Sequence, residues 1–251
     1  MDRLSVVILT KNEERNIARA IKSVKEIADE ILVIDSGSTD RTVEIAKELG
    51  ARVIFRDFTN YPDQVSFAIS KTNNKWVFVL DADEEVSEEL KRSIKETLKF
   101  PKHDCYVVNR RTYFMGKFLN HTLYPEWRIR VFKKDKVKYE GELHEVVKCS
   151  GSIGKLKGDL YHYSFKNLDE FFSKNLKYSK ISAEILYKNG RIVKNYELFT
   201  RPVWTFFKFF IMKRGFLDGW RGFLISASYA FFNFTKYAYL KELQITKNKL
   251  R

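Results

Sequence analysis

The first hundred residues alternate between short apolar runs and segments whose apolar positions recur every three or four residues. The apolar runs predict buried β-strands at residues 4–9, 31–34, 52–55 and 76–80. The segments between them predict helices at residues 17–24, 43–49, 65–69 and 90–98. Strands and helices that alternate at these lengths indicate parallel strands joined by right-handed crossovers. We therefore expect an α/β fold, with a mostly parallel sheet flanked by helices.

Local signals mark the expected ends of these helices. Asp40 and Ser87 precede two of the helical segments, and their side-chain oxygens are suited to cap a first turn. Gly50 follows the predicted helix at residues 43–49, at a position where a residue in the left-handed conformation commonly ends a helix.

The pattern changes after residue 100. Strand-like pieces at 105–108, 128–132 and 158–163 are separated by polar loops. We interpret this region as the second half of the same domain, so that residues 1–165 form one domain with halves 1–100 and 101–165. From residue 166 the pattern is helical, which predicts a C-terminal helical extension over residues 166–251.

Composition narrows the class of protein. Of the 251 residues, 44% are hydrophobic and 31% are charged, which excludes a disordered chain and a protein built mainly of membrane spans. The formal net charge of +14 is concentrated in residues 155–251, which carry 19 basic and 7 acidic side chains. The first residues lack the charged and long apolar stretches of a secretory signal, so we expect a cytoplasmic protein.

The two cysteines, Cys105 and Cys149, form no Cys-x-x-Cys pair and have no histidine cluster beside them. This arrangement indicates neither a zinc site nor a disulfide framework. We expect two unpaired thiols in the core.

Polar clusters follow three of the predicted strands: residues 10–13, 35–40 and 81–84. Each cluster alone is compatible with an ordinary turn or a helix cap. In a parallel sheet, however, the carboxyl ends of the strands meet at one edge, where ligands bind. In an extended segment Asp81 and Asp83 would point the same way and could share Mg²⁺ or Mn²⁺ through oxygen ligands. Such a cation could hold a diphosphate.

Taken in order, the three clusters resemble the nucleotide-sugar elements of the family 2 glycosyltransferases, which have the GT-A fold. The resemblance covers about residues 4–165. It is strongest to the lipopolysaccharide core β-1,4-glucosyltransferase subgroup, through the motifs Asp81-Ala82-Asp83-Glu84, Leu143-His144-Glu145 and Gly215-Phe216-Leu217-Asp218-Gly219. It implies a Rossmann-like nucleotide-binding half, a UDP-sugar or similar donor, a divalent metal and inversion at the anomeric carbon.

The resemblance also implies roles for single residues. The nucleoside pocket would be lined by Thr10, Asn12 and Glu13, with Asp35 facing the base. Asp81 would lie near the ribose, and Asp83 would reach the metal. Many relatives have two adjacent acids where this chain has Asp35-Ser36. Gln64 lies where relatives often place a donor contact, although an exposed helix position fits it equally well.

Inverting transfer also needs a base that takes the proton from the acceptor hydroxyl. The His-Glu pair favours Glu145, with Glu142 as the second candidate; a solvent-facing carboxylate is the alternative for Glu145. Arg128 and Arg130 alternate with apolar residues on one strand and could assist the leaving diphosphate or simply lie on an exposed strand face. His162 is chemically suited to be a further metal ligand, and a structural role among its aromatic neighbours is the alternative.

The C-terminal region combines aromatic and basic residues. Phe206 and Phe210 share a helical face with other apolar residues, and residues 222–235 carry no formal charge. A run of 14 residues is too short to span a bilayer, so we favour a peripheral helix at the membrane interface, with Lys and Arg on anionic head groups. A helical pair packed on the sheet, or a homodimer contact, is the alternative. The aromatics do not alternate with basic residues, which argues against a nucleic-acid partner.

Together these features predict a metal-dependent inverting glycosyltransferase at the inner face of the membrane. It would transfer a sugar from a nucleotide-diphosphate donor, UDP-linked by our expectation, to a glycolipid or oligosaccharide acceptor of the lipid-linked or lipopolysaccharide type. A non-catalytic nucleotide-sugar-binding or membrane-scaffold protein is the alternative. A phosphatase of the Asp-x-Asp type would carry its pair after the first strand, whereas here the pair follows the fourth.

Overall fold

The computed structural model describes residues 2–141, 146–165 and 167–248. The chain divides into two units, which are described separately. Unit 1 comprises Met1–Arg111 and Pro125–Tyr163, and unit 2 comprises Thr112–Tyr124 and Ser164–Arg251. Residues 112–124 are thus grouped with the C-terminal helices.

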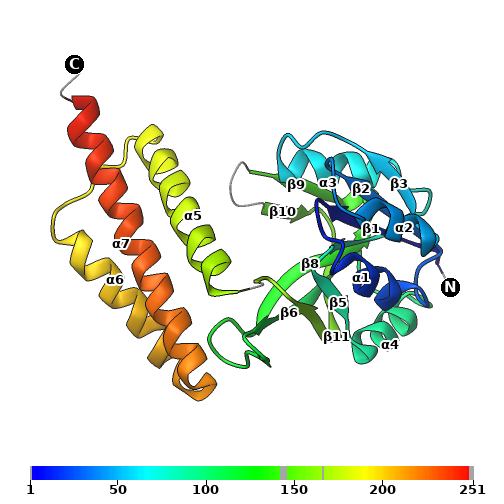
Figure 1. Ribbon diagram of the computed structural model, residues 1–251. Coiled ribbons are helices and arrows are strands. Elements are labelled where there is room, and N and C mark those ends of the chain that lie inside the picture. The colour runs from blue at the N-terminus through cyan, green and yellow to red at the C-terminus, as the bar shows by residue number, and fades with distance from the viewer. Residues whose placement is uncertain (1, 142–145, 166, 249–251) are drawn as a thin grey trace. The chain divides into compact units, whose positions relative to one another are not determined.

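Unit 1 begins with the alternating strands and helices that the apolar pattern predicts (Figure 1). The strands are β1 (Leu4–Thr10), β2 (Glu30–Asp35), β3 (Arg52–Phe55) and β4 (Trp76–Asp81). The helices are α1 (Ile17–Val24), α2 (Thr42–Glu48), α3 (Tyr61–Ser70) and α4 (Glu88–Thr97). The pairs β2–β3, β1–β2 and β1–β4 are all parallel, so the prediction of a parallel half-sheet is confirmed.

The rest of unit 1 adds antiparallel strands to the same sheet. These are β5 (Glu84–Val86), β6 (Cys105–Phe114), β8 (Glu126–Lys133) and β11 (Ile153–His162), with the short helix η1 (Lys134–Lys136) after β8. The strand order is β3-β2-β1-β4-β8-β6-β11-β5. A separate hairpin pairs β9 (Val137–Glu140) with β10 (Val146–Cys149).

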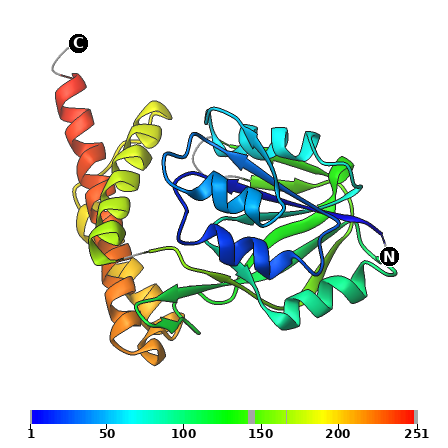
Figure 2. The ribbon, with the colours of Figure 1, turned by 45° about the vertical axis from the view of Figure 1, so that its right-hand side comes forward.

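The core of unit 1 lies on both faces of the sheet, because successive side chains of a strand point to opposite sides. On β1, Val6 and Ile8 belong to the cluster that includes Ile21 of α1 and Ile94 of α4. Val7 belongs to the opposite cluster with side chains of α3. The helices accordingly cover both faces of the sheet (Figure 2). This double cover explains why the central strands β1 and β4 are apolar along nearly their whole length.

The local helix signals act as expected, with one shift. Ser87 caps α4 by accepting a hydrogen bond from Leu90 N, and Gly50 has φ +86° at the end of α2. Asp40 accepts from Thr42 N at 3.0 Å, but α2 begins after Arg41, one residue later than a direct Asp40 cap would place it.

The cysteines correct our expectation of two unpaired thiols, because Cys105 and Cys149 form a disulfide. They are 44 residues apart in the sequence. The fold brings the last residue of β10 against the first residue of β6, within a core cluster that also contains Phe132. Spacing along the chain carries no signal of this contact, which explains why the sequence did not reveal it.

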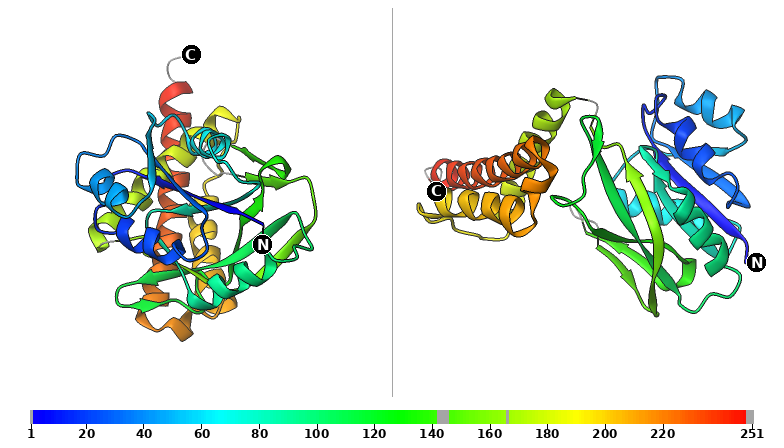
Figure 3. Two further views of the ribbon diagram at one scale, coloured as in Figure 1. Left: turned by 90° about the vertical axis from the view of Figure 1, so that its right-hand side faces the viewer. Right: turned by 90° about the horizontal axis from the view of Figure 1, so that it is seen from below.

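Unit 2 consists of a short β-hairpin and a set of helices (Figure 3). The end of β6 pairs with β7 (Lys117–Phe118). The helices are α5 (Leu168–Lys188), α6 (Glu197–Phe207), η2 (Lys208–Met212), η3 (Gly215–Asp218) and α7 (Trp220–Asn248). Helix α7 packs against both α5 and α6. None of the helices in the described part of the chain is long and apolar enough to span a bilayer.

Asp218 connects the helices of unit 2 to residues 120–122. Its carboxylate accepts hydrogen bonds from the backbone nitrogens of Asn120, His121 and Thr122 at 2.8–3.1 Å and from the Thr122 hydroxyl at 2.8 Å. Burial alone would raise the pKa of Asp218, but these hydrogen bonds outweigh it and lower the pKa. The Gly-Phe-Leu-Asp-Gly motif therefore has a structural role: its aspartate holds residues 120–122 against the helices of unit 2.

Candidate active site

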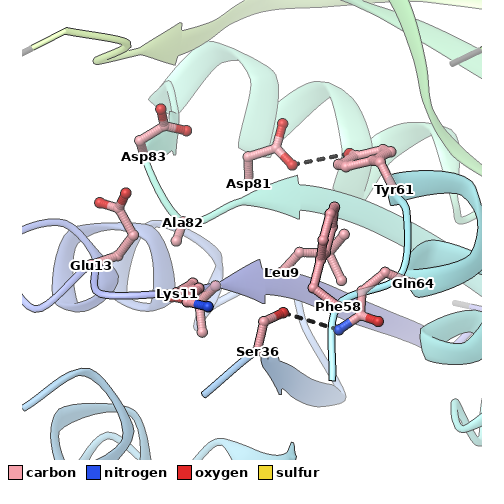
Figure 4. A pocket seen from close by; sticks show the side chains of 11 residues that line it. Leu9, Lys11, Glu13, Ser36, Phe58, Tyr61, Gln64, Asp81, Ala82 and Asp83 are labelled. Carbon is pink, nitrogen blue, oxygen red and sulfur yellow. Dashed lines mark hydrogen bonds between the residues drawn. The ribbon is translucent and has the colours of Figure 1, made fainter. Parts of the chain in front are cut away.

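A cavity of about 360 Å³ opens where the carboxyl ends of β1 and β4 and the segment after β2 meet (Figure 4). Its lining comes from the end of β1, from the three predicted polar clusters, and from α3 and the segment that leads into it. The lining residues are Leu9, Thr10, Lys11, Glu13, Ser36, Phe58, Tyr61, Gln64, Asp81, Ala82 and Asp83. The predicted meeting of the clusters at one edge of the sheet is therefore confirmed.

The last residue of β1, Thr10, and Glu13 of the segment after β1 line the cavity. Asn12, also predicted to line it, instead connects two loops: its backbone nitrogen donates to Ser38 Oγ at 2.9 Å, and its Oδ1 accepts from Thr39 N at 2.8 Å. Asn12 has φ +55°, a left-handed conformation that asparagine adopts more readily than most residues. Its contribution is thus to hold the loop that presents Glu13.

The segment after β2 presents Ser36, and not Asp35, to the cavity. The Asp35 carboxylate accepts hydrogen bonds from the backbone nitrogens of Gly37 and Ser38, both at 2.9 Å, and from the Ser38 hydroxyl at 2.5 Å. Asp35 therefore shapes the turn. Asp35 is not among the residues that line the cavity, and its contact with a base remains a prediction.

Gln64 of α3 is buried at the edge of the cavity, with 1% of its surface exposed. Its Nε2 donates to Ser36 Oγ at 3.1 Å and to the carbonyl oxygen of Arg56 at 3.2 Å. Because a carbonyl can only accept, this contact fixes which end of the amide faces Arg56. The exposed-helix alternative for Gln64 is wrong.

The turn after β4 places two carboxylates in different surroundings. Ala82 and Asp83 form a turn between β4 and β5, and not the extended segment that we expected. Asp81 accepts hydrogen bonds from the Tyr61 hydroxyl at 3.0 Å and from Arg130 Nη2 at 2.7 Å. Burial alone would raise the pKa of Asp81, but the Arg130 guanidinium outweighs it and lowers the pKa.

Arg130 is itself buried and ion-paired. Besides Asp81, it contacts Glu84 at 2.9 Å, and Glu84 has no exposed surface. Burial raises the pKa of Glu84 even though Arg130 opposes this. Burial alone would lower the pKa of Arg130, but the two carboxylates raise it well above its ordinary value. Arg130 thus lies behind the Asp81 carboxylate and does not line the cavity.

Arg128 lies two residues earlier on β8 and is more exposed. It donates to Glu126, which also accepts two hydrogen bonds from Arg110 at 2.9 Å. Burial would raise the pKa of Glu126, but the two arginines lower it to about 2. Arg128 does not line the cavity either, so the predicted diphosphate contacts of both arginines remain predictions.

His162, at the end of β11, lies beside the turn after β4. Its Nε2 is 3.3 Å from Asp83 Oδ2, and Tyr163 N donates to the carbonyl oxygen of Asp83. A carboxylate and an imidazole are suitable ligands for a divalent cation, and Mg²⁺ is commonly held by one or two protein groups together with substrate phosphates and water. Among residues 2–141, 146–165 and 167–248, no group of three or more His, Cys, Asp or Glu is arranged to hold a metal. Asp83 and His162 therefore fit a cation that a diphosphate helps to bind.

The two candidate bases, Glu142 and Glu145, lie outside the described residues. The hairpin strands on either side are described: Glu140 of β9 forms ion pairs with Lys138 at 3.1 Å and Lys148 at 2.6 Å. The disulfide ties the end of β10 to β6. The hairpin that leads to the two candidates is thus fixed by pairing and by a covalent bond.

Sequence reasoning missed several lining residues. Lys11 and Ser36 are members of the predicted clusters and could have been found there. Phe58 lies in the segment between β3 and α3, and Tyr61 is the first residue of α3; no motif marks either of them. Phe58 is 56% exposed although it lines a cavity, and Figure 4 shows its ring between Tyr61 and Ser36. An exposed aromatic ring at a cavity wall is suited to contact a planar ligand group.

Comparison with known proteins agrees with this architecture. Residues 5–155 match the family model described as glycosyl transferase family 2. An uncharacterized glycosyltransferase of Rickettsia typhi is 37% identical over 98% of this chain and 89% of its own length. A lipopolysaccharide core biosynthesis glycosyltransferase of Rhizobium meliloti is 28% identical over 93% of this chain and 91% of its own.

Two solved structures share the fold at low sequence identity. TarS 1–349 of S. aureus aligns over 99% of this chain and 92% of its own, with a TM-score of 0.51 and 14% identity. Glucosyl-3-phosphoglycerate synthase of Mycobacterium tuberculosis, in complex with Mn²⁺, UDP and glucosyl-3-phosphoglycerate, aligns over 77% of this chain and 82% of its own, with a TM-score of 0.50 and 16% identity. The predicted GT-A fold is confirmed.

Proposed function

Because the chain belongs to glycosyltransferase family 2 and is therefore a glycosyltransferase, we propose that it transfers a sugar from a UDP-linked donor to a lipid-linked or lipopolysaccharide-type acceptor, with inversion. The observation that carries this proposal is the cavity itself. It joins the three polar clusters and is bounded by Asp81 at the end of β4 and by Asp83 in the turn that follows. A volume of about 360 Å³ lies within the range of small-molecule sites.

The donor would bind with its nucleoside between the segments after β1 and β2 and its diphosphate at the turn after β4. Thr10, Glu13 and Gln64, which line the cavity, would contact the nucleoside. Asp81, which accepts hydrogen bonds from Tyr61 and Arg130, would contact a ribose hydroxyl. Asp83, with His162, would hold Mg²⁺ or Mn²⁺. When bound, the cation supplies positive charge that stabilises the leaving diphosphate. The tuberculosis enzyme, crystallised with Mn²⁺ and UDP, supports this assignment.

Inversion requires a base on the side of the sugar opposite the diphosphate. We propose Glu145 for this role, with Glu142 as the alternative. The carboxylate takes the proton from the acceptor hydroxyl while the oxygen of that hydroxyl forms a bond to the anomeric carbon. At the same time the bond between the anomeric carbon and the diphosphate oxygen breaks. Attack from the opposite face inverts the anomeric configuration.

The proposed acceptor class is based on a relative that aligns with this chain over nearly the full length of both proteins. The Rhizobium meliloti relative, named for lipopolysaccharide core biosynthesis, aligns over 93% of this chain, which must include most of unit 2. A lipid-linked acceptor is presented at a membrane. We therefore also propose that the protein works at the inner face of the membrane, in peripheral contact with it.

The test is a donor and acceptor screen on the purified full chain. We expect a UDP-sugar with Mn²⁺ or Mg²⁺ to raise the thermal midpoint, because a ligand that binds only the native state stabilises it. We expect the same donor to support transfer to lipid-linked acceptors, and Asp83→Ala to abolish metal-dependent transfer while leaving the midpoint of the free protein unchanged. Asp135→Ala is the matched control, because Asp135 is exposed at the surface of unit 1, where it pairs with the neighbouring Lys136. Full transfer by Asp83→Ala would refute the proposed cation site.

A further inference from the structure

Helix α6 and η2 carry a stripe of apolar side chains that the fold leaves exposed. Phe199, Val203, Phe207 and Ile211 are spaced by four residues, so they lie along one side of the helix. Their exposed fractions are 70%, 69%, 46% and 44%. We call these four residues the outer stripe.

The outer stripe is not the face by which α6 and η2 pack inside unit 2. Phe206 and Phe210, on the other side of the same helical segment, already pack against Phe223 of α7, with ring centroids 5.6 and 5.8 Å apart. The helix therefore buries one face against α7 and keeps a second apolar face outside. Large apolar side chains exposed in a contiguous set mark a contact surface.

More exposed apolar residues extend this surface. Trp204 stacks on Phe207 with ring centroids 6.0 Å apart, and Met212, Phe216, Leu217 and Trp220 follow within and after η2, with exposed fractions of 48–59%. Tryptophan is enriched at membrane–water interfaces, where its apolar body and polar N–H meet different surroundings.

The exposed charges beside the outer stripe are positive. Between residues 196 and 222 the sequence holds two carboxylates. Glu197 is 3% exposed and ion-paired with Arg191 and Arg201, and Asp218 is engaged with the backbone of residues 120–122. The basic residues Lys208, Lys213 and Arg214, in contrast, are exposed. The surface therefore presents aromatic and aliphatic groups with positive charge.

We propose that this surface, the outer stripe with its flanking lysines and arginine, binds an anionic lipid bilayer. Aromatic and aliphatic side chains would enter the boundary between head groups and acyl chains, while Lys208, Lys213 and Arg214 contact anionic head groups. The stripe spans 13 residues, so its first and last members lie about 18 Å apart along a helix, and all four side chains reach the bilayer only if the helix lies flat on it. This agrees with the finding that no described helix can span a bilayer.

A second copy of the chain is a poorer occupant of the same surface. In a two-fold dimer the same patch meets itself, so two surfaces that both carry Lys208, Lys213 and Arg214 would face each other. Like charges placed against each other disfavour such a contact. An anionic bilayer matches both the apolar and the basic component.

The experiment measures co-sedimentation of the full chain with vesicles of phosphatidylglycerol and phosphatidylcholine, and with vesicles of phosphatidylcholine alone. We expect binding to the anionic vesicles, and binding to the neutral ones weaker by at least tenfold. The double variant Val203→Glu/Phe207→Glu should weaken binding to anionic vesicles by about a hundredfold or more. Replacing Lys208, Lys213 and Arg214 together by glutamine should weaken it by about a hundredfold, at roughly fivefold per charge.

Phe100→Glu is the matched control, because Phe100 is 86% exposed and belongs to unit 1. Phe100→Glu should bind anionic vesicles as the natural chain does. All variants should keep the thermal midpoint of the natural chain, because the changed side chains are exposed. Failure of the natural chain to bind anionic vesicles, or unchanged binding by the double variant, would overturn the proposal. A lipid-free dimer that the double variant dissociates, without vesicle binding, would assign the surface to a second copy and would also overturn it.

This inference deepens the proposed function by naming the surface that meets the membrane, but it can fail separately. Vesicle binding is measured without donor or acceptor. Absence of vesicle binding by the natural chain, with transfer to a soluble acceptor intact, would refute only the lipid surface. Vesicle binding without any sugar transfer would refute only the proposed reaction.

Discussion

The guanidinium of Arg130 lies 2.9 Å from the carboxylate of Glu84, a side chain with no exposed surface, in unit 1. The same guanidinium holds Asp81 at the rim of the cavity. The ion pair therefore links the interior of the sheet to the proposed donor site. A buried charge that loses its partner is costly, whereas an exposed pair contributes little.

We predict that Arg130→Met lowers the free energy of unfolding by about 3 to 5 kcal/mol, because it leaves Glu84 buried without its closest cation. Arg128→Met is the control on the same strand. Arg128 is exposed, so its loss should cost about 1 kcal/mol or less. Urea unfolding monitored by circular dichroism measures both, and equal losses in the two variants would contradict the assigned difference in burial.

Glu126 gives a prediction for the pH dependence of stability. Its pKa is lowered from 4.5 to about 2 in the folded chain, against the effect of burial, by Arg110 and Arg128. A depressed folded-state pKa contributes stability that is complete above the unfolded value and is lost as the pH falls toward the folded value. The natural chain should therefore exceed Glu126→Gln in stability by up to about 3 kcal/mol at pH 6. The difference should shrink between pH 4.5 and pH 2; a difference that stays constant over this interval would show that the Glu126 carboxylate is not held by the arginines.

The disulfide between Cys105 and Cys149 should stabilise the native state by limiting the unfolded chain. For a separation of 44 residues, the loop-closure relation gives about 4 kcal/mol as an upper expectation. We predict that a reductant lowers the urea midpoint of the natural chain and leaves that of Cys149→Ala unchanged. Thiol titration should find no reactive thiol in the unreduced chain, even in urea. Two thiols titrating in urea without reductant would contradict the bond.

Glu145→Gln tests the proposed base. Removing the proton acceptor while keeping the size of the side chain should leave the donor affinity unchanged and reduce transfer by about 10² to 10⁴-fold. Glu142→Gln is the matched comparison, three residues away in the same segment. Donor affinity is read from the thermal shift with a UDP-sugar, and transfer from product formation. If only Glu142→Gln loses transfer, Glu142 is the base and the assignment is wrong.

The parallel half of the sheet could be predicted because its signals are local. Apolar runs and helical spacing extend over four to ten residues, and a cap such as Ser87 acts within one helical turn. The same logic located the site, because the carboxyl ends of parallel strands meet at one edge whatever the details of packing. Thr10, Ser36 and Asp81 meet there for this reason.

The tertiary structure alone decided the contacts between distant segments. The tertiary structure placed Arg130 in the interior and Arg128 at the surface, although both alternate with apolar residues on the same strand. Their burial differs because it depends on which segments pack over each position. The tertiary structure brought His162 to Asp83, and Tyr61 to Asp81, across 79 and 20 residues of sequence. It also bonded Cys105 to Cys149. These pairings depend on the order in which strands join the sheet, which no local pattern encodes. What the sequence determined by itself was therefore the repeating α/β architecture and the edge where its polar clusters gather; which side chains meet there was set by long-range packing.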